Sequence, residues 1–64
     1  MLPQEVIAIK RDGGHLSEAE IRFMVEGLTA ETISEGQVAA FAMAIFFRGL
    51  ALDERVALTR AMRD

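Results

Sequence analysis

The feature that most constrains this chain is a run of ten apolar residues, 38–47, with a helix-start signal before it and a helix-stop signal after it. Ser34 can cap the start, because its hydroxyl can accept from the backbone amide three residues on, where a glutamine side chain can reach back. Gly49 suits the end, since a residue without Cβ can adopt the left-handed conformation that closes a helix. These signals predict a helix over residues 35–48.

Between its caps this helix presents no charged side chain, so it is predicted to be buried nearly all round at the centre of the fold. At about 100° per residue, one face is bulky and comprises Val38, Phe41, Ala42 and Ile45. The opposite face is a ridge of small residues flanked by two large ones: Gly36, Ala40 and Ala44, with Met43 and Phe47. Either the other helices of this chain cover both faces, or the ridge meets a second chain.

Capping and periodicity predict three further helices, over residues 3–13, 18–28 and 53–63. Pro3 suits a first helical position, and Ser17 begins the second helix with another capping box. Asp53 is the expected cap of the last helix, for which Ala51 would be poorer. Four helices with short links predict an all-α, up-and-down four-helix bundle around the central apolar helix.

Composition limits what such a bundle can do. The chain has 64 residues, no cysteine for a disulfide or a thiolate site, and a lone His15 that cannot build a zinc site. Its net charge is −3 with scattered basic residues, which disfavours nucleic-acid binding. Ten apolar residues in a row are too few for a membrane span, which needs about 20. No secretory signal begins the chain, so a cytoplasmic protein is expected.

No catalytic, cofactor-binding or metal-binding residue is predicted. His15 has no nearby serine or cysteine nucleophile, and both Ser17 and Ser34 have capping roles. Lys10 and Arg11 are interpreted as cations at a helix C-terminus, because no glycine-rich cradle for phosphate surrounds them.

Association is the function that the residues themselves favour. An apolar fraction of 52% is high for so small a chain and predicts surplus apolar surface. A homodimer is expected, since twofold symmetry is the commonest closed arrangement. The predicted interface residues are Gly36, Ala40, Met43, Ala44, Phe47, Val6 and Ile9. Because the last helix reaches Asp64 without a C-terminal cap, the chain is interpreted as a fragment.

A resemblance to the bacterial thymidine phosphorylase family rests on five segments: MLPQEV, IKRDGG, LSEAEIRFMVEGLT, SEGQVAAFAMAIFFRGL and LDERVALTRAMRD. The most specific parts are EIRFMVEGLT and GQVAAFAMAIFFRG. Looser versions of the second are similar to pyrimidine nucleoside phosphorylases and to the helical domain of anthranilate phosphoribosyltransferase. Departures from the family pattern are Ile9, His15 and Ala51, of which only Ala51 bears on a helix boundary.

The resemblance implies the N-terminal helical domain of a larger, two-domain α plus α/β enzyme of pyrimidine nucleoside metabolism. That enzyme is a pentosyltransferase that converts thymidine and phosphate to thymine and 2-deoxy-α-D-ribose 1-phosphate, with phosphate as co-substrate and no cofactor. In the family the phosphate site and catalytic groups lie in the α/β domain, so no catalytic residue is carried over and residues 1–64 alone are expected to be inactive.

These helices are implied to form dimer contacts and a scaffold that moves against the α/β domain. Two alternatives stay open: a free-standing helical interaction module, and the helical domain of a related phosphoribosyltransferase.

Overall fold

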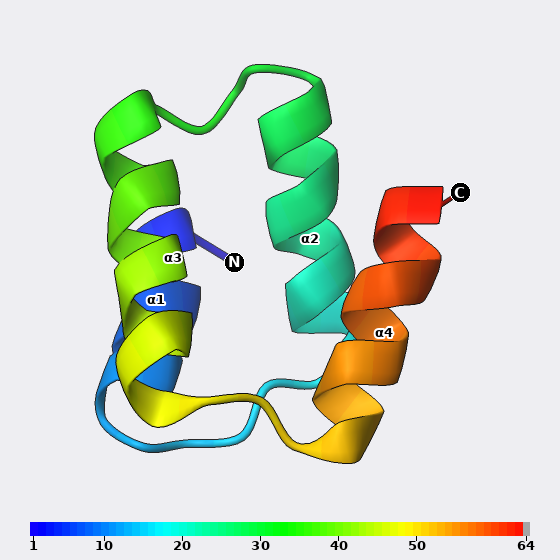
Figure 1. Cartoon of the computed structure of the whole chain (residues 1–64). Coiled ribbons are helices and arrows are strands. Elements are labelled where there is room, and N and C mark those ends of the chain that lie inside the picture. The colour runs from blue at the N-terminus through cyan, green and yellow to red at the C-terminus, as the bar shows by residue number, and fades with distance from the viewer. Residues whose placement is uncertain (64) are drawn as a thin grey trace.

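A computed structural model describes residues 1–63, and the four helices of this part of the chain are joined by short connections (Figure 1). They are α1 (Pro3–Arg11), α2 (Glu18–Thr29), α3 (Glu35–Arg48) and α4 (Leu52–Arg63). No strand occurs in the described residues, and the all-α fold class is confirmed. The first helix ends two residues before its predicted end, because Gly13 leaves the helical path with a φ of 86°.

Two capping boxes start α2 and α3 where the sequence predicts them. The hydroxyl of Ser17 accepts from the amide of Glu20 at 3.1 Å, and that of Ser34 accepts from the amide of Gln37 at 3.2 Å. In each box the glutamate or glutamine side chain accepts in return from the serine amide. Gly49, with a φ of 74°, closes α3. The predicted bounds of this helix are therefore confirmed at both ends.

The predicted cap of α4 is wrong, because the helix begins at Leu52 and Asp53 lies inside its first turn. The carbonyl of Ala51 accepts the first helical hydrogen bond, from the amide of Arg55 at 3.0 Å. The free amide of Ala51 donates to the carboxylate of Glu54 at 2.7 Å. An acidic side chain three residues on thus makes the half of a capping box that needs no side-chain acceptor on the alanine.

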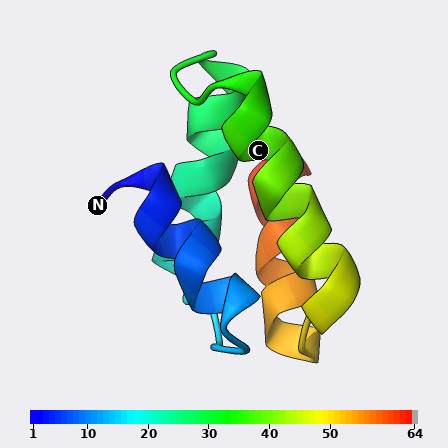
Figure 2. The ribbon, with the colours of Figure 1, turned by 90° about the vertical axis from the view of Figure 1, so that its left-hand side faces the viewer.

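The helices alternate in direction along the chain but pack as two parallel pairs (Figures 1 and 2). One pair is α1 with α3, and the other is α2 with α4. At one end of the first pair, the side-chain amide of Gln37 donates to Gln4 at 3.5 Å. At the other end, Arg48 Nε donates to the carbonyl of Arg11 at 2.8 Å. Since N-terminal residues meet N-terminal ones and C-terminal residues meet C-terminal ones, the two helices run in the same direction.

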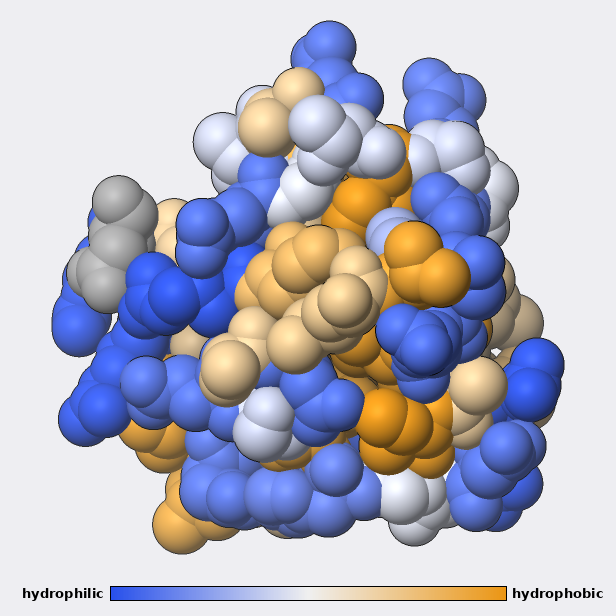
Figure 3. All heavy atoms as spheres, turned by 180° about the vertical axis from the view of Figure 1, so that it is seen from behind, coloured by the Kyte–Doolittle hydropathy of each residue, from blue (hydrophilic) through white to orange (hydrophobic). Residues whose placement is uncertain are grey.

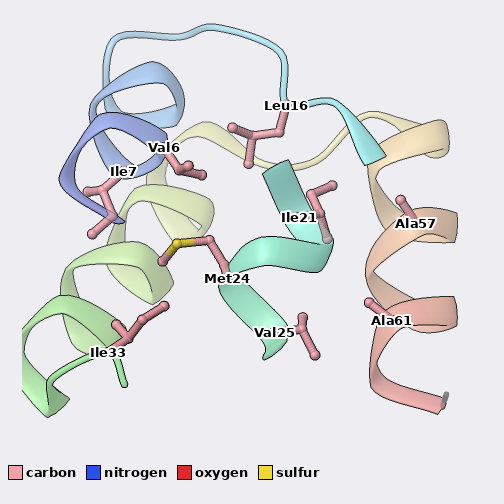
Figure 4. Close-up of a cluster of buried hydrophobic side chains, with 9 residues drawn as sticks. All are labelled: Val6, Ile7, Leu16, Ile21, Met24, Val25, Ile33, Ala57 and Ala61. Carbon is pink, nitrogen blue, oxygen red and sulfur yellow. The ribbon is translucent and has the colours of Figure 1, made fainter. Parts of the chain in front are cut away.

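The hydrophobic core is built by α1, α2, α4 and the two flanking loops (Figure 4). Val6 and Leu16 are 0% and 1% exposed, Met24 reaches from α2 toward the α1–α3 pair, and the small Ala57 and Ala61 face α2 from α4. The remaining core residues are Ile7, Ile21, Val25 and Ile33. The core therefore lies beside α3 and not around it.

The prediction that α3 is central and buried nearly all round is wrong. Ala44 is its only buried residue, and Phe46 and Phe47 are 78% and 72% exposed. Its bulky face, with half-buried Val38 and Phe41, lines a groove of about 190 Å³ toward α2 and α4. The reason lies in the pairing: α1 covers one side of α3, whereas α2 and α4 bury their apolar stripes mainly against each other.

Surplus apolar surface, as the composition predicts, is present. The face of the molecule that Figure 3 shows from behind has hydrophobic side chains at its centre, bordered by hydrophilic ones. Large apolar residues that are exposed elsewhere in the described chain include Leu2, Leu28, Leu52 and Met62. A single chain of this length does not bury all of its apolar side chains.

Candidate functional site

An open apolar groove between α1 and α3, here called the α1–α3 groove, is the candidate functional site. It encloses about 650 Å³. The lining residues are Ile7, Arg11, Ala40, Met43, Ala44, Phe47 and Arg48. Its walls are apolar along α3 from Ala40 to Phe47, and its two arginines belong to the last turns of α1 and α3. Such a surface can accept another apolar helix.

The structure places four of the seven predicted interface residues on the exposed side of α3: Gly36, Ala40, Met43 and Phe47. Ala44 is 7% exposed and lies at the bottom of the groove, against α1. Ile9 is half-buried against the core. Val6 is fully buried, so its predicted place in an interface is wrong: it points from α1 into the core (Figure 4).

A buried ion pair at the C-terminal end of the groove-forming helices was missed by the sequence analysis. Lys10 Nζ lies 2.9 Å from the Glu54 carboxylate and donates to the carbonyl of Gly49 at 3.1 Å. The same carboxylate accepts from the amide of Leu16 at 2.6 Å and from that of Ala51 at 2.7 Å. These five residues, here called the Lys10–Glu54 cluster, join α1, α3, α4 and the α1–α2 loop.

Local hydrogen bonding decides the ionisation of Glu54. Burial alone would raise its pKa, but the amides of Leu16 and Ala51 and the Lys10 ammonium outweigh burial and hold the pKa at about 2, below the ordinary 4.5. A carboxylate this firmly ionised and enclosed is a poor proton carrier at neutral pH. Its role is to fix the ends of three helices, and with them the end of the α1–α3 groove.

A second pair lies at the surface next to this cluster. His15 Nε2 is 2.8 Å from the carboxylate of Asp53, and both side chains are exposed. The hydrogen bond to Asp53 raises the pKa of His15, and it lowers the pKa of Asp53 in turn. Asp53, predicted to be a helix cap, thus links the first turn of α4 to the loop before α2.

One sequence signal could have located part of this arrangement. A glutamate three residues after Ala51 is half of a capping box, so Glu54 could have been assigned to the start of α4. No local pattern announces its second partner, Lys10, which lies 44 residues away.

The described residues offer a packing surface. No group of three His, Asp or Glu side chains among residues 1–63 is arranged to hold a metal ion. None of the helices in this range has the length and apolar character to cross a membrane. The features that point to a function are accordingly the α1–α3 groove and the exposed side of α3.

Comparison with known proteins assigns the chain to a protein family. Residues 4–64 match the family described as glycosyl transferase family, helical bundle domain. Over 64 residues the chain is 66% identical to a thymidine phosphorylase of Sinorhizobium medicae and 66% identical to one of Sinorhizobium fredii. Each alignment covers all of this chain and 15% of the relative, so the chain spans less than one sixth of the length of these relatives.

Proposed function

Because this chain belongs to the glycosyl transferase family through its helical bundle domain, we propose that it is the N-terminal helical segment of a thymidine phosphorylase. The observation that carries the proposal is the 66% identity to thymidine phosphorylases over the full 64 residues. The complete enzyme would transfer the pentosyl group of thymidine to phosphate, and would act in the cytoplasm as part of pyrimidine nucleoside metabolism. Thymine and 2-deoxy-α-D-ribose 1-phosphate would be its products.

Within that enzyme the proposed role of residues 1–64 is mechanical. The apolar side of α3 and the α1–α3 groove would form contacts in a homodimer, for which they offer Ala40, Met43 and Phe47. The bundle as a whole would serve as a scaffold that moves against an α/β domain carrying the phosphate site. The Lys10–Glu54 cluster supports this role, because it ties the ends of three helices into one unit.

A chimera tests the proposal directly. The aligned segment of the Sinorhizobium medicae enzyme is replaced by this chain, and phosphate-dependent release of thymine from thymidine is measured. Since about two thirds of the residues are identical, we expect the chimera to remain active. The control is the same enzyme lacking the segment, which should be inactive.

Two outcomes would contradict the proposal. The first is a folded chimera without activity, which would favour a different phosphoribosyltransferase or a free-standing interaction module. The second is turnover by the isolated 64-residue chain above a buffer blank, because the groups that bind phosphate are proposed to lie outside it.

A further inference from the structure

The outer face of α4 carries three exposed arginines. Arg55, Thr59 and Arg63 follow one another at intervals of four residues, so they lie on one side of the helix, each roughly 6 Å along the axis from the next. Arg60 is exposed beside Thr59. Figure 3, in which α4 lies at the left, shows strongly hydrophilic side chains along that side. Because the opposite side of α4 packs into the core, the arginines extend into solvent (Figure 4).

These arginines have no counter-ion, although the net charge of the chain is −3. None of the ion pairs found among residues 1–63 includes an arginine of α4. The two acidic residues in the first turn of this helix, Asp53 and Glu54, contact basic side chains of the α1–α2 loop and of α1 instead. No acidic residue of the sequence lies three or four positions from Arg55 or Arg63, so neither can form the usual ion pair along a helix.

The needs of the helix itself do not account for this arrangement. Arg60 and Arg63 complement the dipole in the last turn of α4, but Arg55 lies at the end of the first turn, where the dipole disfavours a cation. Arg60 and Arg63 are also three positions apart, the spacing at which like charges repel each other. An anion bound between the arginines would offset both effects.

We propose that the outer face of α4 binds a phosphate group, held between the guanidinium groups of Arg55 and Arg63 with Arg60 beside them. A shallow hollow of about 250 Å³, lined by these arginines together with Val56 and Thr59, provides the space. At roughly 30 Å³ per water molecule, it has room for a phosphate group and several waters. The inference is independent of the proposed thymidine phosphorylase activity, whose phosphate site is expected in the α/β domain.

The chemistry of the hollow favours phosphate over a carboxylate. A guanidinium group can donate two parallel hydrogen bonds to either anion. A carboxylate carries one charge and two oxygens, which a single arginine can satisfy. A phosphate ester carries a charge of about −1.5 to −2 near pH 7 and three acceptor oxygens, so it can engage two or three arginines at once. The lining adds no competing acceptor, since Val56 is apolar and the Thr59 hydroxyl donates to the carbonyl of Arg55 at 2.9 Å.

An NMR titration of the 64-residue chain tests the site. Inorganic phosphate is added at constant ionic strength, and the Nε–H signals of the arginines are followed in ¹H–¹⁵N spectra. We expect shifts concentrated at Arg55, Arg60 and Arg63, with a dissociation constant on the order of 1 mM, as two charge-assisted hydrogen bonds at an exposed site allow. Acetate at the same ionic strength should shift these signals far less. Equal shifts with acetate, or none with phosphate, would overturn the proposal.

Variants separate a built site from overall charge. Arg55→Gln and Arg63→Gln should each weaken phosphate binding at least about tenfold, because each removes a charge-assisted hydrogen bond. Thr59→Glu keeps all three arginines and should also abolish binding, because its carboxylate takes the place of the anion one turn from Arg55 and Arg63. The matched control is Gln4→Glu, which changes the net charge by the same one unit at the exposed start of α1 and should leave binding unchanged.

A second ligand identifies the source of the phosphate group. Glycerol 3-phosphate, a phosphomonoester, is titrated beside inorganic phosphate, and circular dichroism checks that each variant is folded. Binding of both ligands, lost in Arg55→Gln, assigns the site to the terminal phosphate group of a larger molecule, whereas binding of inorganic phosphate alone assigns it to the free ion. Undiminished binding by Arg55→Gln and Arg63→Gln, or equal weakening by Gln4→Glu, would overturn the site, because binding would then reflect only the charge of the whole chain.

Discussion

Lys10 and Glu54, at 4% and 2% exposure, are the two buried charged residues among residues 1–63. Removing such ions from water costs several kcal/mol each, and good geometry with further hydrogen bonds is needed to offset it. Here the carboxylate has two backbone donors besides the ammonium, and the ammonium has a carbonyl besides the carboxylate. The pair therefore fixes one arrangement of helix ends.

Lys10→Met should lower the free energy of unfolding by about 3–5 kcal/mol, because it leaves the buried Glu54 carboxylate without its counter-ion. The matched control is Arg11→Met, which removes an exposed cation whose pair with Asp12 contributes about 0–1 kcal/mol. Urea denaturation at one chain concentration measures both. Similar losses for the two variants would contradict the structural role of the cluster.

Acid should unfold the chain through Glu54. The folded-state pKa of about 2 lies below the ordinary 4.5, so the stabilisation is complete above pH 4.5 and is lost as the pH falls toward 2. We expect the free energy of unfolding to decrease over this interval, and NMR titration of the Glu54 carboxyl carbon to give a midpoint near 2. A midpoint near 4.5 in the folded chain would show that the carboxylate is not held as described.

At the scale of single elements, the turn between α2 and α3 depends on a close approach. Gly27 is buried near the end of α2, where a Cβ would overlap Ile33 Cδ1 and lie 2.5 Å from its Cγ1. Ile33 is itself in the core at 6% exposure, so it has little room to move. The glycine lets the α2–α3 loop fold back onto α2, where the amide of Thr32 donates to the Gly27 carbonyl at 2.9 Å.

Gly27→Ala is therefore expected to destabilise the chain by about 1–2 kcal/mol, because overpacking against Ile33 exceeds the gain in helix propensity. Gly36→Ala is the matched control in α3, where the open space should give a gain of about 0.5–1 kcal/mol. Thermal unfolding at a concentration that keeps the chain monomeric measures both variants. Equal stabilisation by the two substitutions would mean that Ile33 yields without cost.

At the scale of the whole molecule, the pairing of parallel helices decides where apolar surface remains. Since α1 packs on α3 and α2 packs on α4, the apolar stripes of three helices close the core, and α3 keeps one side uncovered. Phe46 and Phe47 stack edge to face at 5.5 Å on that uncovered side. This surface is where we expect a second copy to bind.

Ala40→Glu should dissociate the proposed dimer, because it would bury a carboxylate without a partner at a cost of several kcal/mol. Thr59→Glu, on an exposed position of α4, is the control and should leave association unchanged. Sedimentation equilibrium measures both, and far-UV circular dichroism excludes unfolding. A folded Ala40→Glu variant that still dimerises would move the interface away from α3.

The starts of α2 and α3 and the protein family follow from the sequence by itself. The starts at Ser17 and Ser34 are predictable because each capping box joins residues three apart, so its hydrogen bonds form wherever the helix is placed. The family resemblance also rests on the residues of the whole chain. The 66% identity to thymidine phosphorylases agrees with it.

Only the tertiary structure decided which surfaces are covered. The apolar run of α3 predicts burial, but burial also requires neighbouring helices that cover it. Which helices pack together depends on the apolar stripes of all four, and here α2 and α4 pack against each other. The same competition turned Val6 inward, away from the predicted interface. It also brought Lys10 to Glu54 across 44 residues. Helix capping can be predicted from the sequence because it joins residues a few positions apart. Packing depends on all four helices together, so it cannot be predicted from any one of them.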